Sequence, residues 1–362
     1  MKNIDLRKLS ELTSPDRAFL TIYSSGNKKS EDILDNLTSR KKVLKNNDDE
    51  YLHFNENFKL VENDLKKKPE EKKSFVIFCC WALDYYKKYE LGPEVEDIIR
   101  IDSSPYILPI AQLRDEYEDH IIITATNEKT KIYLVSAQKN IQEEKIEGDI
   151  KNHVKVGGWS QQRYERRRDK EFSRYTKNIS EKVKEMLKGS NLRRIIMVGS
   201  KETIKELSEA FPGEIREKIA GEKAVDLKKG EDFLNAEIFK LLWEEERRSE
   251  KEMWGLVKRR FFSGELSVNG IKDVIYFLKR GRVDKVIVDK DIEYSGIRCR
   301  QCEELTPEEA DICPKCGSTS VFKVDLKNEI VELLELSGGD IEFASGIEEL
   351  KELDGIAALL RY

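Results

Sequence analysis

Four cysteines in the last third of the 362-residue sequence have the spacing of a metal site. Cys299 and Cys302 form one C-x-x-C pair, and Cys313 and Cys316 form a second pair after ten intervening residues. Two such pairs can place four thiolates around a tetrahedral Zn²⁺ ion, which leaves no coordination position open for a water. We therefore predict a structural zinc site. Disulfide bonds are the alternative, and a reducing compartment argues against them.

A glycine pair ahead of a strongly basic stretch is the second chemical feature. Residues 151–177 contain nine Lys and Arg against three Asp and Glu, a local charge of +6 in a chain whose net charge is −5. Gly157 and Gly158 permit a close approach of the backbone to a ligand, and we expect a helix to begin near Ser160, a suitable N-cap. Arginine-rich helices bind phosphate groups, although a solvated charged helix is the alternative.

Two glutamines follow the glycines within one turn. Gln161 and Gln162 cannot act as bases, but a glutamine amide can orient a water and donate to a developing oxyanion. A Gly-Gly loop, a glutamine and a basic helix together suggest a probe inserted into a crowded RNA site, where positioning supplies most of the rate.

This segment resembles a motif of the class-1 peptide release factors of archaea and eukaryotes. It reads GGWSQQRYERRR and aligns without a gap with the GGQSALRFARLR-type segment of that family. The C-terminal run Asp354–Tyr362 is similar to the family ending GGIGGILRY, and the cysteine pairs lie where archaeal members carry a zinc minidomain. The resemblance covers about residues 118–362.

One departure from the family concerns the catalytic position. The family's glutamine aligns with Trp159, a pattern similar to the VLRF group, the release-factor-like domain of Vms/Ankzf-type peptidyl-tRNA hydrolases, in which the working glutamine lies slightly downstream. The resemblance therefore implies Gly157, Gly158 and Gln161 as catalytic residues, with Gln162 as the alternative to Gln161. The RNA-binding residues that it implies are Lys155, Arg163, Arg166, Arg167 and Arg168.

A second departure concerns codon reading. No YxCxxxF string occurs, and Asn27–Ser30 matches the family's NIKS motif by letters alone, directly after an expected strand. We therefore expect a codon-independent peptidyl-tRNA hydrolase, an ester hydrolase that acts with the large ribosomal subunit in ribosome rescue. An elongation-factor-like GTPase is a candidate partner.

Two other functions stay open. A non-catalytic splitting or recruitment factor resembling the Pelota branch is favoured by Trp159 and disfavoured by the retained glycines and glutamines. Cleavage of the tRNA 3′-CCA end is the other, with His153 as the tempting general base. The sequence does not separate ester from phosphodiester chemistry.

The pattern of expected helices and strands around these residues predicts an α/β protein of three domains. We expect a diverged N-terminal α+β domain (1–117), an RNase H-like central domain (118–232) and an α/β/α third domain (233–362) with a zinc-ribbon insert at 297–320. Within the central and third domains we expect a hairpin over 120–135, a strand over 194–198, a helix over 231–258, a helix over 268–280 and a strand over 283–288. Trp243 and Trp254 are predicted as core, and 329–354, with nine acidic side chains and one basic, as an acidic face.

Composition limits the classes further. Charged residues make up 37% of the chain and the hydrophobic set 39%, which excludes general disorder and low-complexity classes. No apolar run approaches the roughly 18 residues of a membrane span, and the N-terminus has no apolar signal region. We expect a cytoplasmic monomer that does not bind membranes.

Walker A, HExxH, Rossmann and GxSxG motifs do not occur.

Overall fold

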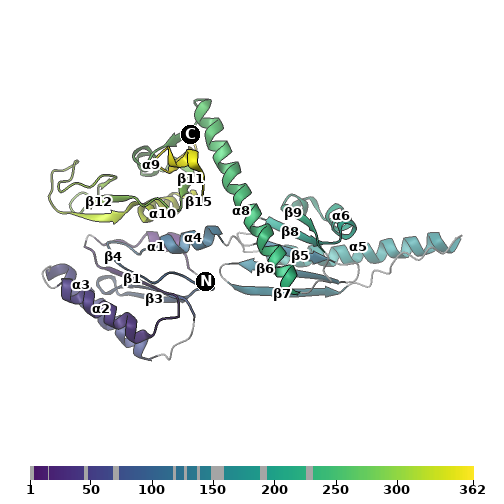
Figure 1. The fold of residues 1–362 in the computed structure, drawn as a ribbon, viewed down its shortest axis with the longest axis horizontal. Coiled ribbons are helices and arrows are strands. Elements are labelled where there is room, and N and C mark those ends of the chain that lie inside the picture. The colour runs from purple at the N-terminus through teal and green to yellow at the C-terminus, as the bar shows by residue number, and fades with distance from the viewer. Residues whose placement is uncertain are drawn as a thin grey trace. The chain divides into compact units, whose positions relative to one another are not determined.

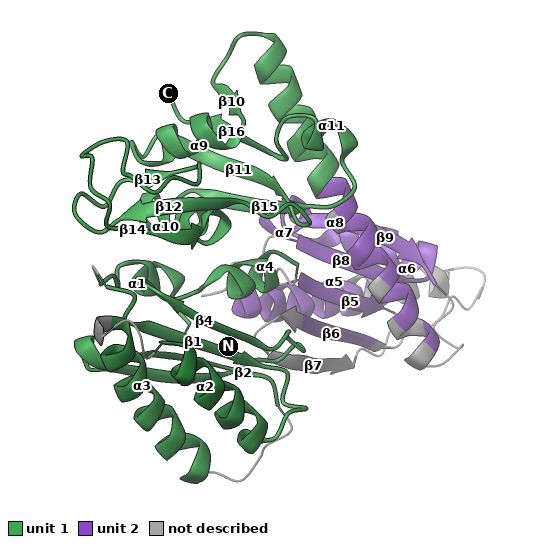
Figure 2. Cartoon of the chain, turned by 60° about the vertical axis from the view of Figure 1, so that its left-hand side comes forward, with its two compact units in different colours: residues 1–116, 250–362 green, residues 117–249 purple. Residues whose placement is uncertain are grey.

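The computed structural model describes residues 4–14, 16–44, 48–67, 73–116, 120–125, 129–136, 139–147, 159–187, 194–225 and 231–362. The chain divides into two compact units, one made of residues 1–116 and 250–362 and the other of residues 117–249 (Figure 2). Figure 1 shows the elements in chain order.

The N-terminal part of the first unit is a sheet covered by a helical hairpin. Its four strands are antiparallel, in the order β3-β2-β1-β4. Apolar residues of both helices, among them Leu37, Phe54 and Val61, pack with Leu20 and Ile22 of β1. The elements are α1 (Leu6–Ser10), β1 (Phe19–Ser24), α2 (Ser30–Leu44), α3 (Asp48–Lys67), β2 (Phe75–Cys80), η1 (Trp81–Leu83), β3 (Tyr85–Glu90), β4 (Ile98–Asp102) and α4 (Leu108–Glu116).

The C-terminal part of the same unit is an α/β/α sandwich with an inserted ribbon. Its sheet has the order β10-β16-β11-β15, and only β11 and β15 pair in parallel. The C-terminal end of α8 packs on one face through Trp254 and Val257, against Ile287, Ala357 and Leu359. Helices α9 and α10 contact the sheet as well. The elements are β10 (Ser267–Asn269), α9 (Ile271–Leu278), β11 (Val283–Asp289), α10 (Leu326–Ser337), β15 (Asp340–Ala344), α11 (Glu348–Lys351) and β16 (Ile356–Leu360), and the ribbon strands are β12 (Ser295–Cys299), β13 (Leu305–Thr306) and β14 (Val321–Asp325).

The second unit is a five-stranded sheet in the order β7-β6-β5-β8-β9. An antiparallel meander, β5-β6-β7, is followed by β8 and β9, which run parallel to β5. Alternate residues of each strand face opposite sides: Ile121 and Ile123 meet α5 and α6, whereas Ile122 meets α8. The elements are β5 (His120–Ala125), β6 (Lys129–Ser136), β7 (Lys139–Glu147), α5 (Trp159–Leu187), β8 (Arg194–Gly199), α6 (Lys201–Ala210), α7 (Gly213–Arg216), β9 (Ile219–Ala224) and α8 (Glu231–Phe262).

The predicted α/β multidomain fold is confirmed, with an RNase H-like strand order in the second unit. The predicted hairpin over 120–135 is confirmed by β5 and β6, and β7 is an additional strand that the sequence analysis did not predict. Two local predictions are wrong. Val268 lies in β10, because the helix begins only at Ile271, after Gly270 with a φ of 81°. Trp243 is 61% exposed, although Trp254 is buried as predicted. The three-domain division stays a prediction.

The predicted acidic face over 329–354 is also only partly exposed. Glu329 and Glu332 point into the first unit, where they are buried, so they contribute no surface charge. None of the helices in the described ranges is both long enough and apolar enough to cross a membrane.

Candidate functional site

The glycine loop precedes helix α5 of the second unit. Gly157 and Gly158 lie outside the described residues, as do Lys155 and His153. The helix begins at Trp159, so Ser160 lies within it and not at its N-cap. The backbone of α5 carries, in its first three turns, Gln161, Gln162, Arg163, Arg167 and Arg168, whose side chains lie outside the described set.

The C-terminal half of α5 anchors this segment on the sheet. Tyr175, Ile179 and Val183, at helical spacing, are buried against β5, β6 and β8. The Tyr175 hydroxyl is hydrogen-bonded to the hydroxyl of Thr130 on β6, and burial raises the pKa of Tyr175. Figure 1 shows the N-terminal half of α5 continuing beyond the sheet of its own unit. The fold therefore holds the glutamines on a helix that is fixed at its other end.

A basic stripe follows one face of α5. Arg166, Lys170 and Arg174 recur every four residues, so they lie on the same face, and all three are exposed. Within the described ranges none of them has a carboxylate partner, whereas Lys177 pairs with Glu181 at 3.8 Å. Unpaired, exposed cations at this spacing can contact successive phosphates of an RNA backbone. Of the predicted RNA-binding residues, the structure describes the side chain of Arg166.

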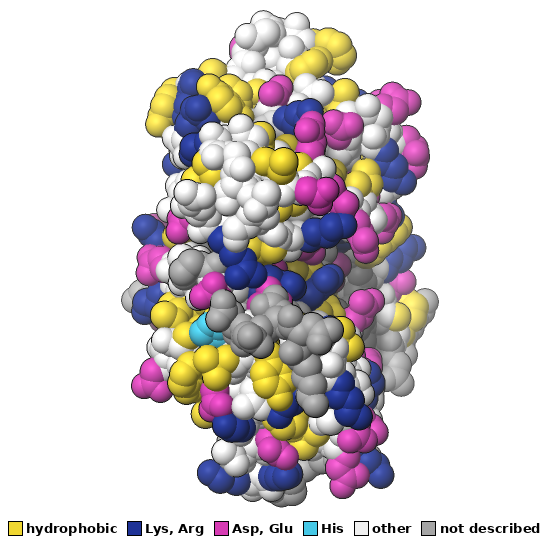
Figure 3. Space-filling model, turned by 90° about the vertical axis from the view of Figure 1, so that its left-hand side faces the viewer, with side chains coloured by type: hydrophobic (Ala, Val, Ile, Leu, Met, Phe, Trp, Pro, Cys, Tyr) yellow, Lys and Arg dark blue, Asp and Glu magenta, His cyan; other side chains and the backbone are white. Residues whose placement is uncertain are grey.

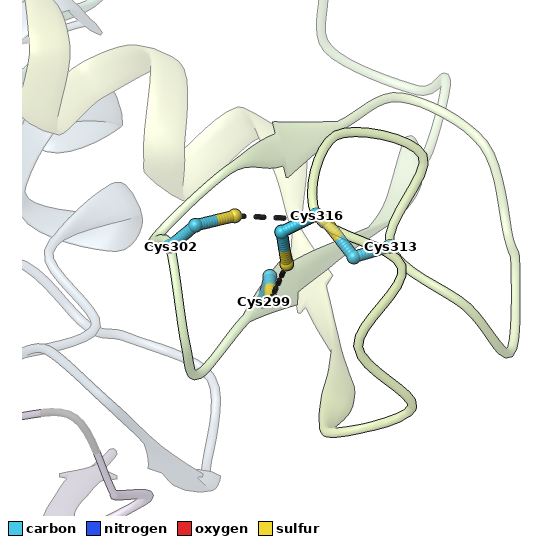
Figure 4. Close-up of side chains that lie close together, drawn as sticks. All are labelled: Cys299, Cys302, Cys313 and Cys316. Carbon is cyan, nitrogen blue, oxygen red and sulfur yellow. Dashed lines mark hydrogen bonds between the residues drawn. The ribbon is translucent and has the colours of Figure 1, made fainter.

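The four predicted cysteine ligands come together in the ribbon (Figure 4). Their Sγ atoms all lie within 4.8 Å of one another. The Cys299–Cys316 and Cys302–Cys313 sulfur distances are both 3.6 Å. A disulfide needs about 2.0 Å, while four thiolates at the Zn–S distance of about 2.3 Å stand roughly 3.8 Å apart. The cluster could therefore bind a metal ion such as zinc.

The two cysteine pairs are built in the same way. Glu303 N–H donates to the carbonyl of Cys299 (3.0 Å), and Gly317 N–H donates to that of Cys313 (2.9 Å). Glu303 and Gly317 both have positive φ, 56° and 74°. These two tight turns aim backbone N–H groups at the sulfur atoms.

These backbone donors stabilise thiolates. Burial raises the pKa of Cys299, but N–H groups of Cys302 and Gln301 donate to its sulfur and lower the pKa to about 6. The N–H groups of Cys316 and Lys315 lower the pKa of Cys313 in the same way. A backbone N–H lowers the pKa of Cys302 and of Cys316 as well, but burial and hydrogen bonds with the neighbouring cysteines outweigh it and raise the pKa of both. This environment therefore favours the thiolate, which is the form that binds a metal, at two of the four sulfurs.

The ribbon also contacts the N-terminal sheet region, which the sequence did not predict. Arg300, between the first two cysteines, donates to Glu50 of α3 at 2.8 Å and lies 3.3 Å from Asp16. Glu50 is buried and also pairs with Arg17. Spacing within the chain carries no signal for such a contact, since its partners are 250 residues apart.

A second unpredicted feature is a buried carboxylate cluster on α10. Glu329 pairs with Arg298 of β12, and Glu332 accepts from Ser104 (2.7 Å) and from Asn328 (2.7 Å). Burial raises the pKa of Glu329 to about 7 against the opposing effect of Arg298. Burial and then the charge of Glu329 raise the pKa of Glu332 well above its ordinary value.

Comparison with known proteins found that this chain is similar to release factors. Residues 105–245 match the family model described as bacterial archaeo-eukaryotic release factor family 10. The chain is 27% identical over 301 residues to peptide chain release factor subunit 1 of Thermococcus kodakarensis, covering 73% of this chain and 71% of the relative. The same protein of Methanocaldococcus jannaschii is 27% identical over 303 residues, with the same coverage.

Two solved structures are similar at lower identity. An archaeal translation termination factor is 16% identical and covers 99% of this chain and 96% of its own, with a TM-score of 0.27. Dom34 of S. cerevisiae, a translation termination-like factor, is 14% identical and covers 83% and 82%, with a TM-score of 0.44. TM-scores this low support no further comparison. The sequence matches support the resemblance of this chain to the archaeal/eukaryotic release factor superfamily, over residues 105–245 for the family model and at 27% identity for the two relatives.

Proposed function

We propose that this release-factor-like protein is a ribosome-associated, codon-independent peptidyl-tRNA hydrolase that frees stalled nascent chains. The observation that carries the proposal is the order Gly157-Gly158, Gln161-Gln162 and basic helix α5 within a chain that resembles this superfamily. The exposed stripe of Arg166, Lys170 and Arg174, without carboxylate partners among the described residues, supports it, because cations at this spacing can contact successive phosphates of RNA.

In the proposed hydrolysis, each role is assigned to a small set of residues of this chain. Water attacks the ester carbon that joins the peptide to the 3′ oxygen of the tRNA, and the products are a peptide carboxylic acid and a free 3′ hydroxyl. The glycines let the loop approach the ester, and the amide of Gln161 orients the water and donates to the oxyanion. Lys155, Arg163, Arg166, Arg167 and Arg168 hold the surrounding phosphates.

Zinc in the ribbon is proposed as a structural ion held by the four cysteines, remote in function from the ester chemistry. The proposed partners are the large ribosomal subunit, peptidyl-tRNA and an elongation-factor-like GTPase. One observation favours a different candidate: Trp159 stands where the family has its glutamine, as expected of a non-catalytic, Pelota-like splitting factor.

Peptide release from large subunits loaded with labelled peptidyl-tRNA, without a stop codon, tests the proposal. Wild type is compared with Gln161→Ala, Gln162→Ala and Gly158→Ala, and the tRNA 3′ end is mapped. We expect release with an intact CCA end and a loss of about 100-fold or more in Gln161→Ala. Gln112→Ala, on α4 of the other unit, is the matched control and keeps full activity.

Each alternative has its own result. Loss only in Gln162→Ala retains the hydrolase and moves the catalytic position by one residue. A shortened tRNA end identifies an endonuclease and directs attention to His153. Tight ribosome binding without release from any variant or from wild type contradicts the hydrolase and supports the splitting factor.

A further inference from the structure

Three segments of the first unit meet at one edge of the C-terminal sheet. Strand β10 pairs with β16 so that Leu360 N–H donates to the carbonyl of Leu266 (2.9 Å). On the other side of β16, Arg361 N–H donates to the carbonyl of Arg282 (2.9 Å). These pairings bring together the turn after α8, the end of α9 and the last two residues of the chain.

This edge exposes aromatic side chains. Phe262 is 82% exposed, Tyr362 66% and Tyr276 50%, and Phe261 and Leu266 are also exposed. We name these five residues the aromatic edge. Figure 3 shows hydrophobic side chains beside basic ones in the upper part of the molecule, where Figure 1 places the C-terminal end of α8. A cluster of exposed rings, as opposed to single scattered ones, marks an interaction surface.

Arginines accompany the rings. The guanidinium carbon of Arg280 lies 3.4 Å from the centre of the Tyr276 ring, and that of Arg282 lies 5.5 Å from the centre of the Tyr362 ring. Arg282 donates to the main-chain oxygen of Tyr362 and Arg280 to the carbonyl of Tyr276 (2.9 Å), which holds each guanidinium beside its ring. In the part of the chain that the structure describes, no ion pair with an Asp or Glu side chain involves Arg280 or Arg282, or Arg259 and Arg260 at the end of α8. Residues 258–282 hold seven Lys and Arg against two Asp and Glu, a local charge of +5 in a chain of −5.

The chemistry of this edge selects one class of partner. An apolar protein surface needs rings but not a row of arginines, and an acidic peptide needs arginines but not exposed aromatic faces. Unpaired nucleotides need both, since each base stacks on an aromatic ring or a guanidinium plane while its phosphate meets a positive charge. We propose that the aromatic edge binds single-stranded or loop RNA by stacking. This binding does not depend on the hydrolase activity proposed for the second unit.

Fluorescence anisotropy with the full chain tests this proposal. The probes are a fluorescein-labelled 12-nucleotide single-stranded RNA and a 12-base-pair RNA duplex. Both are measured in the background Arg166→Glu, Lys170→Glu, so that binding by α5 is weakened. The variant Phe262→Leu, Tyr276→Leu keeps the surface apolar but removes two rings, and because both side chains are exposed the change leaves the core intact.

We expect the double-leucine variant to lose at least about fivefold in affinity for the single strand and less than twofold for the duplex. Tyr276→Phe retains affinity, and Trp81→Leu, which removes a 45% exposed ring of the N-terminal part, also retains it. Photocrosslinks from a 4-thiouridine strand should fall within residues 259–282.

Three results overturn the proposal. They are unchanged single-strand affinity in the double-leucine variant, crosslinks confined to other segments, and a loss seen with alanines at both positions but not with leucines. The last result would identify an apolar protein contact in place of stacking.

Discussion

At the scale of single residues, Glu303 occupies a position that favours glycine. Its φ of 56° repeats the φ of 74° at Gly317, the corresponding residue of the second cysteine pair. A left-handed conformation costs a residue with a Cβ roughly 1 kcal/mol. A Cβ added at Gly317 would meet nothing within 4 Å, so its cost is conformational and not steric.

The two positions therefore predict opposite outcomes. Glu303→Gly is expected to stabilise the ribbon by about 0.5–1 kcal/mol, and Gly317→Ala to destabilise it by about 1 kcal/mol. Chemical denaturation of the metal-loaded chain measures both. Gly264→Ala, which also has positive φ and open space but lies outside the ribbon, controls for the general cost; a destabilised Glu303→Gly contradicts the argument.

Glu332 predicts how the stability of the first unit depends on pH. Its carboxyl shares one arginine, Arg298, with Glu329, and Asp102 adds further negative charge. An acid whose pKa is raised by folding keeps its proton when the unfolded chain has released it. Its contribution to stability is therefore complete below the ordinary pKa of a glutamate, about 4.5, and declines as the pH rises from there toward the raised pKa of the folded state.

Glu332→Gln removes this decline. We expect the variant to exceed wild type by about 1–2 kcal/mol in unfolding free energy at pH 8, and the difference to shrink at pH 5. Unfolding curves at both pH values measure it. The exposed Glu348→Gln serves as the control, and an advantage of equal size at both pH values would show that the effect is packing and not ionisation.

At the scale of elements, α5 combines an anchored half with an exposed basic stripe, Arg166, Lys170 and Arg174. Replacing Arg166 and Lys170 by Glu is expected to weaken binding to ribosomes or tRNA and to lower the slope of log affinity against log salt by about 2, since each phosphate contact contributes about one. Stability should not change, because both side chains are exposed. Binding is measured between 50 and 200 mM salt, as an experimental range chosen for backbone contacts.

The matched control reverses two exposed lysines of α6, Lys201 and Lys205, in the same unit. An equal loss of slope in the control would mean that the overall charge, and not the stripe, governs binding.

The ribbon predicts an effect of metal removal at a distance. Because Arg300 lies between two ligands and pairs with Glu50 of α3, loss of the ion should loosen both the ribbon and this contact. We expect a chelator to increase hydrogen exchange in residues 295–325 and around Glu50, and to leave β5 and β8 of the second unit unchanged. Faster exchange in both units alike would contradict a local structural role.

At the scale of the whole molecule, the N-terminal and C-terminal parts of the first unit are joined by a buried polar contact. The side-chain oxygen of Asn328 on α10 accepts from the N–H groups of Ile107 (2.8 Å) and Leu108 (3.0 Å), which begin α4. Asn328 is buried, so its loss would leave two donors without partners in an apolar setting.

Asn328→Ala is expected to lower the unfolding free energy of the first unit by about 2–4 kcal/mol and to expose residues 103–116 to proteases. Limited proteolysis and denaturation measure this. Asn36→Ala, on the exposed side of α2, should behave as wild type. A variant that resists proteolysis as wild type does would show that apolar packing alone joins the two parts.

The sequence by itself determined the features whose information is local. Cysteine spacing predicted the ligand cluster at Cys299, Cys302, Cys313 and Cys316, and the apolar patterns predicted β5, β6, β8, β11 and most of α8, because hydrophobic periodicity is set by neighbours along the chain. The GG-containing segment predicted the resemblance to release factors, which the sequence matches support. The predicted roles of Gln161 and of the glycines stay predictions.

Only the tertiary structure decided which side chains are buried and which side chains contact each other. Glu332 and Ser104 are 228 residues apart, and nothing in the local pattern of 329–354 distinguishes a buried carboxylate from an exposed one. Likewise, Trp243 is exposed although Leu241 and Glu245 of the same helix are buried, so it lies on the face of α8 that does not meet the sheet, and Phe262 is exposed at the C-terminal end of α8. Long-range pairing selects one face of each helix, and periodicity alone does not say whether a partner covers it.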